Sequence, residues 1–543
     1  MATATSSGGE RAGNQGWTPQ RSVAGNRNPW AIVGVISIAT FMTVLDTSIV
    51  NVALDHIAGS LAVSYDEASW VSTTFLIASA IVIPISGWLA NVIGRKRYYM
   101  GSVALFTFAS FCCGVAPNLD LLILARIVQG AAGGGLAAVE QSMLVDTFAP
   151  QRRGMAFAAY GMVVIAGPII GPVVGGWITD NASWQWCFLI NVPVGALSLF
   201  LVNTFVEEPP ALKREREALL ANGLKVDIIG FILVGLFFGC LEVTLDRGQE
   251  DDWFASSLIV ATSLVTVISL MVFIPWELTR KAPIVPIRMF GNRNFGLASI
   301  FLLLTGVIIF GTTLFIPQLL QQVMGYTATD AGLALTAGGL ATIVAMPISG
   351  FLTGRVDARY LIGGSFLVQA LALMNMSHFS TDMAFANAAE ARVFQAVGIP
   401  FLFVPLTNLA YVGLRPEDSN QASAMMNMAR NLGGTMGISL VETMLSRRQQ
   451  FHQSRMTETL DPLNPNYTAG LGRITRALVE HGQSVAAAPS EALATLYRSV
   501  QRQSAMLSYV DVFEILAMVI FASLLLVFLM RGQSTPADPG TPK

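Results

Sequence analysis

The sequence predicts an all-α polytopic membrane protein, and three observations support this fold class. The 543-residue chain has 53% hydrophobic residues and only 12% charged ones, whereas soluble domains have about 25% charged residues. Its mean hydropathy is +0.58. Apolar stretches long enough to cross a bilayer recur along it, and such a stretch needs about 20 helical residues because a bilayer core is about 30 Å thick.

Fourteen spans of this length can be placed along the chain. They begin near Trp30, Ala68, Tyr98, Leu121, Gly154, Trp186, Val226, Ser256, Asn294, Asp330, Tyr360, Phe385, Asn420 and Ser508. The polar segments 1–29 and 531–543 are expected to be disordered cytoplasmic tails. Segment 1–29 lacks the apolar stretch that a signal peptide would contain.

Basic residues in the loops predict the orientation of the spans. Alternate loops hold sixteen Lys and Arg residues, whereas the opposite short loops hold only Arg247. Lys and Arg accumulate in cytoplasmic loops, so both termini are expected in the cytoplasm. The loop 446–507 would then lie outside, and its seven arginines do not change this prediction because long loops cross largely regardless of charge.

An internal repeat divides the chain. PISGWLANVIGRKR, which starts at Pro84, returns as PISGFLTGRVDAR from Pro347, at an offset of 263. ARIVQ from Ala125 returns as ARVFQ from Ala391, at an offset of 266. Repeated six-helix units are typical of transporters that alternate access by rocking one unit against the other.

The repeat predicts the domain boundaries and singles out one carboxylate. Two six-helix halves are expected at 30–206 and 294–530, with two inserted helices and their flanking loops at 207–293. DTSIV from Asp46 aligns with GTTLF from Gly311, at an offset of 265. A charge needed only to build the six-helix unit should be present in both copies, so Asp46 is expected to have another role.

Asp46 is the main candidate for a functional residue. It follows Trp30 by sixteen residues, which is about 24 Å along a helix. If Trp30 marks the inner interface, Asp46 lies in the outer half of the bilayer. Carboxylates at such depth are costly and are functional candidates by default. We predict that Asp46 loads a proton outside and releases it inside; the alternative is a purely structural partner for an arginine.

Arg126, in the fourth span, is the cation expected to modulate Asp46. A guanidinium is permanently charged and cannot itself carry the proton. Gln129 follows on the same helix face and is a candidate for the lining of a central cavity. Glu140 lies fourteen residues after Arg126, about 21 Å along a straight helix, so we expect an interfacial position for it.

The second half contains a further group of polar candidates. Arg392 repeats Arg126. Asn427, Arg430 and Asn431 share one face of the thirteenth span, where they are predicted to line a central cavity and contact substrate. The alternative is that the arginine is held by carbonyl groups at a helix end.

Small residues dominate the fifth span. Gly167, Gly171 and Gly175 recur every four residues, with Pro168 and Pro172 between them. This spacing predicts a kinked helix that packs closely against a neighbour.

Five motifs together resemble a known group of transporters. They are LDTSIVNVAL, GWLANVIGRKR, RIVQGAAGGG, GPIIGPVVGG and WQWCFLINVPVG. They are similar to those of the fourteen-helix drug:proton antiporter branch of the major facilitator superfamily, of the EmrB/QacA type. The resemblance covers nearly the whole chain, and the long external loop is most similar to the EmrB subgroup.

The resemblance implies a major facilitator fold and roles for two motifs. The glycine and proline residues of the fifth span would form the antiporter motif. Gly87, Asn91, Gly94 and Arg95 would form the gating loop between the second and third spans. Asn91 stands where the family usually has an aspartate, so it can accept a hydrogen bond but cannot form an ion pair.

These features predict a proton-coupled multidrug efflux transporter that exports hydrophobic toxic compounds across the inner membrane of a Gram-negative cell. The chain would be a secondary antiporter and not an enzyme, with no catalytic constellation, metal site, nucleotide loop, nucleic-acid partner or cofactor beyond the proton gradient. The alternatives are a dedicated exporter of one metabolite or siderophore and a non-transporting membrane sensor.

The EmrB resemblance also implies partners, namely a periplasmic adaptor protein and an outer-membrane channel in a tripartite system. Apolar residues recur at helical spacing in the external loop, in two stretches. They are Leu471, Ile474 and Leu478 in the first, and Leu493, Leu496, Tyr497 and Val500 in the second. These faces would either dock the adaptor or pack against each other.

Overall fold

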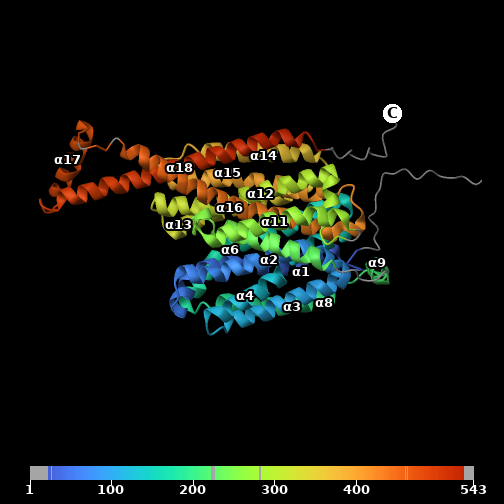
Figure 1. The fold of residues 1–543 in the computed structure, drawn as a ribbon. Coiled ribbons are helices and arrows are strands. Elements are labelled where there is room, and N and C mark those ends of the chain that lie inside the picture. The colour runs from blue at the N-terminus through green and yellow to red at the C-terminus, as the bar shows by residue number, and fades with distance from the viewer. Residues whose placement is uncertain are drawn as a thin grey trace, which may run out of the picture.

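The computed structural model describes residues 22–25, 27–221, 227–280, 283–458, 460–461 and 463–530. Within them the chain forms a bundle of long helices that run side by side (Figure 1). α1 (Pro29–Leu61) begins and α18 (Ala488–Val527) finishes at the same end, which we call the terminal end. α17 (Pro465–Glu480) lies beyond the opposite end, which we call the hairpin end.

The six predicted spans of the N-terminal half are present, and two of them are interrupted. The fourth is divided at Gly134 and Gly135, and the sixth begins with one separate turn. After α1 the helices are α2 (Tyr65–Ile93), α3 (Arg95–Gly114), α4 (Leu119–Gly133), α5 (Leu136–Thr147), α6 (Pro150–Asn181), α7 (Trp186–Leu189) and α8 (Asn191–Phe205).

The insert and the C-terminal half follow in the predicted order. The insert consists of α9 (Pro210–Ala221), α10 (Ile228–Arg247) and α11 (Ser257–Thr279). The C-terminal half consists of α12 (Arg293–Gln318) with the π-helical η4 (Leu319–Val323), α13 (Ala328–Leu352), α14 (Ala358–Met376), α15 (Phe385–Ala410), α16 (Ser419–Thr457), α17 and α18. Short 3₁₀ turns are η2 (Trp253–Ala255), η3 (Ile287–Gly291) and η5 (Pro416–Asp418).

The predicted fold class is confirmed. In the described part of the chain, eleven helical segments are long and apolar enough to cross a membrane. The other three predicted spans correspond to α3, α14 and α16. Each of the fourteen predicted spans therefore coincides with a helix.

Two corresponding helices, one in each half, begin with the same type of N-terminal cap. Ser64 and Glu67 form a capping box at the start of α2, and Thr327 and Asp330 form the same box at the start of α13. In each box the two side chains satisfy backbone N–H groups that the first helical turn leaves unpaired. Both pairs differ by 263 residues, which is the offset found in the sequence.

The inserted helix α10 contacts both halves. Thr73 on α2 donates a hydrogen bond to Asp246, with 2.6 Å between Oγ1 and Oδ2. Thr435 on α16 donates to Glu242, with 3.1 Å between Oγ1 and Oε1. The insert is therefore anchored by polar contacts to each half.

The predicted external loop contains helices where its apolar residues recur at helical spacing. The loop 446–507 is largely helical, because α16 continues to Thr457 and α18 already begins at Ala488. α17 packs against α18, so the two amphipathic stretches cover each other in part.

Most of the predicted tails 1–29 and 531–543 lies outside the described residues. Within the first tail, Val23 and Ala24 are buried, and the Val23 carbonyl accepts a hydrogen bond from the Glu207 N–H.

Candidate functional site

Asp46 and Arg126 form an ion pair inside the N-terminal half. Asp46 lies on α1 and Arg126 on α4, and 2.6 Å separates Oδ2 of the aspartate from Nη1 of the arginine. The side chains are 0% and 1% exposed. A single buried charge would be strongly destabilising, so each residue makes the burial of the other tolerable.

Two amides complete the surroundings of the Asp46 carboxylate. Gln129 Nε2 and Asn191 Nδ2 both donate to Oδ1, at 2.9 and 2.7 Å. Ser110 Oγ lies within 3.2 Å of the first amide nitrogen and 3.0 Å of the second. Gln129 was predicted to line a cavity; in this conformation its side chain is fully buried in the cluster.

Further contacts fix the Arg126 guanidinium in one plane. Nε donates to the Val71 carbonyl at 2.9 Å, and Nη1 also donates to Gln129 Oε1 at 2.9 Å. The guanidinium carbon lies 4.2 Å from the centre of the Phe75 ring, where cation–π attraction adds to the hydrogen bonds. The arginine is held in place independently of Asp46, so the carboxylate can change its protonation state without releasing the cation.

The glycine motif brings α6 against α1 next to this cluster. A Cβ atom added at Gly167 would lie 2.7 Å from Val44 Cγ1, and one added at Gly171 would lie 2.5 Å from Ser48 Oγ. These distances are too short for any side chain larger than hydrogen, so the close packing expected of this motif is present. Val44 and Ser48 lie two residues before and after Asp46, so α6 packs against the side of α1 that faces away from the carboxylate.

The residues of the predicted gating loop, between α2 and α3, contact the C-terminal half near the terminal end. The Asn420 amide on α16 donates to Asn91 on α2 and accepts from Ser142 Oγ on α5 at 2.5 Å. Arg95 Nη2 donates to Ser419 Oγ at 2.9 Å. A Cβ atom at Gly87 would lie 2.8 Å from the Asn420 carbonyl oxygen, so α2 and α16 are in close contact here.

The ion pair of this motif does not involve Asn91. Arg95 forms an ion pair with Asp146 of α5, so the carboxylate comes from another helix and Asn91 contributes only a neutral hydrogen bond. Gly94 has φ +98°, which other residues rarely adopt. It lets the chain turn sharply from α2 into α3 and brings Arg95 to the interface.

Glu140 is a second buried carboxyl group, and its predicted interfacial position is wrong. Its side chain is 0% exposed, and Oε2 accepts a hydrogen bond of 2.5 Å from Thr40 Oγ1 on α1. Oε1 has no hydrogen-bond partner among the described residues. The prediction assumed one straight helix from Arg126, whereas the glycines after α4 interrupt the span and α5 continues among α1, α3 and α6.

The polar residues of α16 form part of the contact between the halves. Asn427 Nδ2 donates to Gln141 Oε1 on α5 at 2.8 Å, and Asn427 Oδ1 accepts from Arg430 Nη2 at 3.0 Å. Asn427 is 3% exposed, so it joins the halves and does not line an open cavity in this conformation. Asn431 is partly exposed on the same helix.

Arg392 occupies in the C-terminal half the position that Arg126 has in the N-terminal half. Its Nη1 donates to Gln395 Oε1 at 2.6 Å and to Thr312 Oγ1 at 3.1 Å. The spacing of arginine and glutamine, three residues, is the same as that of Arg126 and Gln129. The side chain is 6% exposed and therefore not open to a cavity either.

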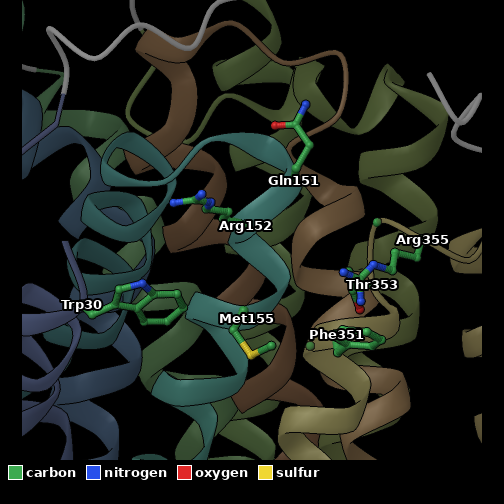
Figure 2. Close-up of a pocket in the computed structure, with 9 residues that line it drawn as sticks. Trp30, Gln151, Arg152, Met155, Phe351, Thr353 and Arg355 are labelled. Carbon is green, nitrogen blue, oxygen red and sulfur yellow. The ribbon is translucent and has the colours of Figure 1, made fainter. Parts of the chain in front are cut away.

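A pocket of about 350 Å³ lies where α6 and α13 meet near the terminal end (Figure 2). It does not include the Asp46 cluster. Arg152 on α6 and Arg355 just after α13 stand on its two sides (Figure 2). Its lining consists of Trp30, Gln151, Arg152, Met155, Gly350, Phe351, Thr353, Gly354 and Arg355.

Sequence reasoning found Asp46, Arg126 and Gln129 but missed two other members of the buried cluster, Asn191 and Ser110. Asn191 stands within a quoted motif, yet a single asparagine at a helix start is more often a cap than part of a charged cluster. Ser110 had no signal beyond its polarity, because the helices that cover it come from distant parts of the chain.

Comparison with known proteins gives one family and one fold. Residues 36–438 match the family model of the Major Facilitator Superfamily. The chain is 39% identical to the multidrug export protein EmrB of Haemophilus influenzae, over 79% of this chain and 83% of the relative. It is 34% identical to the fatty acid resistance protein FarB of Neisseria gonorrhoeae, over 83% and 87% of the two chains.

Solved structures support the same fold. The proton:xylose symporter XylE, bound to 6-bromo-6-deoxy-D-glucose, superposes with a TM-score of 0.57 over 91% of this chain and 96% of that chain. The two sequences are 13% identical. The likeness therefore concerns the arrangement of helices alone.

Proposed function

Because the chain belongs to the Major Facilitator Superfamily, and to its EmrB-type branch, we propose that it is a proton-coupled multidrug efflux transporter. The main observation in support of proton coupling is the buried ion pair of Asp46 and Arg126. In the other half the sequence aligns Gly311 with Asp46, and the residue that contacts Arg392 in the structure is Thr312, so neither carries a charge. The carboxylate is therefore a feature of one half, as expected for a proton site and not for a structural element of the repeated unit.

The coupling follows from the electrostatics of the cluster. While Asp46 is ionised, the positive charge of Arg126 is neutralised within 2.6 Å. When Asp46 takes up a proton, the guanidinium remains as an uncompensated buried cation, and the buried arrangement becomes less favourable. Protonation thus favours a conformation in which water reaches the cluster, and rocking of the halves exposes it to either side in turn.

The contacts between the halves support a state closed toward the terminal end. The hydrogen bonds of Asn91, Ser142 and Gln141 with α16 all lie on that side of the bundle or near its middle. We propose that the terminal end is cytoplasmic. Its loops and helix ends carry basic residues, in agreement with the positive-inside rule. They are Lys96, Arg97, Arg152, Arg153, Arg288, Arg355, Arg359 and Arg415.

The hairpin formed by α17 and α18 supports the binding of a partner protein at the hairpin end. α17 and α18 extend past the bundle (Figure 1), and Val485, Leu493 and Tyr497 are more than half exposed there. Exposed apolar side chains of this kind mark interaction surfaces. In an inner membrane the hairpin would reach the periplasm, where an adaptor protein of a tripartite system would bind it.

Transport by the purified protein in proteoliposomes tests the proposal. A lipophilic cationic dye is supplied on the terminal side, and a pH gradient is imposed in one direction and then reversed. We expect dye movement that follows the gradient and stops when the gradient is collapsed by a protonophore. Dye movement that is equal with and without the gradient would contradict proton coupling.

A dedicated exporter is the second candidate, because the relative from Neisseria gonorrhoeae is named for resistance to one compound class, fatty acids. A broad panel of toxic compounds on a deletion strain separates the two functions. Rescue against chemically unrelated compounds supports the multidrug function, and rescue against one class supports the specialist.

A further inference from the structure

The pocket between α6 and α13 carries two positive charges that the transport cycle outlined above does not use. Arg152, near the start of α6, and Arg355, just after α13, stand on its two sides (Figure 2). The residues that line the pocket include no acid. In the described part of the chain neither guanidinium forms an ion pair or a hydrogen bond, and the nearby Asp357 is paired with Arg359 at 2.7 Å. The pocket therefore presents two uncompensated cations.

The pocket lies where the two halves of the protein cross closely. A Cβ atom added at Gly154 on α6 would lie 2.7 Å from Thr353 Cβ, and one added at Gly350 on α13 would lie 2.7 Å from Ala158 Cβ. The two arginines thus come from different halves but border one cavity of about 350 Å³. Pockets for small molecules range from about 300 to 1,000 Å³, so this one suits a small polar group.

A row of exposed apolar side chains leads away from the pocket along α13. It consists of Leu340, Val344, Ile348 and Phe351, which are all more than half exposed. They recur every three or four residues and therefore share one face of the helix. In a membrane protein such a face contacts the acyl chains, because exposing it to water would be costly. Phe351 also lines the pocket, so the apolar face and the charged cavity are continuous.

The position of the pocket corresponds to the level of the lipid headgroups. α6 begins at Pro150 and α13 ends at Leu352, so the cavity lies at the ends of both helices. Trp30, which is 41% exposed, lines the same cavity. Exposed tryptophans gather at the interface between membrane and water. Basic pockets between membrane helices on the cytoplasmic side bind anionic headgroups.

We propose that this pocket binds the phosphate headgroup of an anionic phospholipid, whose acyl chains lie along the apolar face of α13. The planar guanidinium groups of Arg152 and Arg355 suit the oxygens of a phosphate. Because each arginine belongs to a different half, a headgroup held by both links the halves and stabilises the conformation closed at the terminal end. The site goes beyond the export function proposed above, and lipid binding does not depend on that function.

Thermal unfolding of the full-length protein in a non-ionic detergent tests the site without any transport. Phosphatidylglycerol, phosphatidylcholine and free glycerol phosphate are added in separate titrations. We expect phosphatidylglycerol to raise the unfolding temperature by about 2 °C or more at saturation, because a ligand that binds only the native state stabilises it. Phosphatidylcholine should have a clearly smaller effect, since its choline cation is repelled by the arginines. Free glycerol phosphate should also have a clearly smaller effect, since it has no acyl chains.

Variants of exposed arginines make the result specific. The double variant Arg152→Gln/Arg355→Gln should lose the response to phosphatidylglycerol, and each single variant should weaken it. Lys96→Gln/Arg97→Gln is the matched control, because it removes two positive charges from the start of α3, at the same end of the bundle but outside the pocket. This control should keep the wild-type response.

Three results would overturn the proposal, even if proton-coupled export is confirmed. The first is no response of the wild type to phosphatidylglycerol, or an equal response to phosphatidylcholine. The second is an equal response in the wild type and in Arg152→Gln/Arg355→Gln. The third is a response to free glycerol phosphate as large as that to phosphatidylglycerol, which would assign the pocket to a soluble phosphate compound.

Discussion

Asp46 Oδ2 lies 2.6 Å from Arg126 Nη1, although eighty residues separate the two positions and neither side chain is more than 1% exposed. In the second half the arginine is retained, and its Nη1 donates to the neutral hydroxyl of Thr312, also eighty residues away. The two halves thus share a helical framework but differ in charge. This asymmetry gives the N-terminal half a group that can bind a proton next to a fixed cation, and it leaves the C-terminal half with the cation alone.

Replacing Arg126 with lysine tests whether the planar guanidinium is needed. A lysine keeps the charge but cannot donate at once to Val71, Asp46 and Gln129 with the fixed geometry of the guanidinium. Losing one charge-assisted hydrogen bond costs about 1.5–3 kcal/mol, so we expect at least an about tenfold lower transport rate. Dye transport in proteoliposomes measures this, and full activity would show that a point charge suffices.

The close packing of α6 on α1 predicts a sensitive position at Gly171. An alanine there would place its Cβ 2.5 Å from Ser48 Oγ, so α6 must shift or Ser48 must move. We expect Gly171→Ala to lower transport clearly and Ser48→Gly to restore it in the double variant. Gly176→Ala is the matched control on the same helix, since its Cβ would meet nothing within 4 Å. Equal loss in both alanine variants would contradict a specific role of the contact.

The contact between Asn91 and Asn420 predicts a cross-link that locks the halves. In a background without the four native cysteines, Asn91→Cys and Asn420→Cys place two thiols at positions whose side chains now touch. Oxidation should abolish transport, and reduction should restore it. The single variants serve as controls for local damage. Transport that continues in the fully cross-linked protein would show that this interface does not open during the cycle.

Glu140 is predicted to be neutral in this state, because it is fully buried and no cation lies beside it in the described part of the chain. Glu140→Gln keeps an acceptor for the Thr40 hydroxyl and should leave the thermal unfolding temperature nearly unchanged. Glu140→Leu leaves that hydroxyl without this partner and should lower the unfolding free energy by about 1–3 kcal/mol. A large loss of stability in the glutamine variant would instead show that the charge of Glu140 is paired.

Much of the architecture could be predicted because it follows from length, hydropathy and repetition. The fourteen spans and the two halves needed no knowledge of contacts. The depth of Asp46 in the outer half of the bilayer stays a prediction from the rise of a helix. Arg126 was expected to modulate it, and the ion pair shows that the two side chains are in contact. Asn191 and Ser110 could not be predicted in this way, since their positions depend on how α3 and α8 pack around α1. Glu140 was misplaced because a break after α4 changes which residues share a face.

Proton release coupled to drug uptake in everted membrane vesicles tests the central claim most directly. The wild type should release protons when a transported drug is added. Asp46→Asn keeps the size of the side chain but leaves the Arg126 charge uncompensated, so it should unfold at a lower temperature. The folded variant in the vesicles should still bind the drug but release no protons. Drug-dependent proton release from Asp46→Asn at the wild-type rate would show that Asp46 is not the proton site.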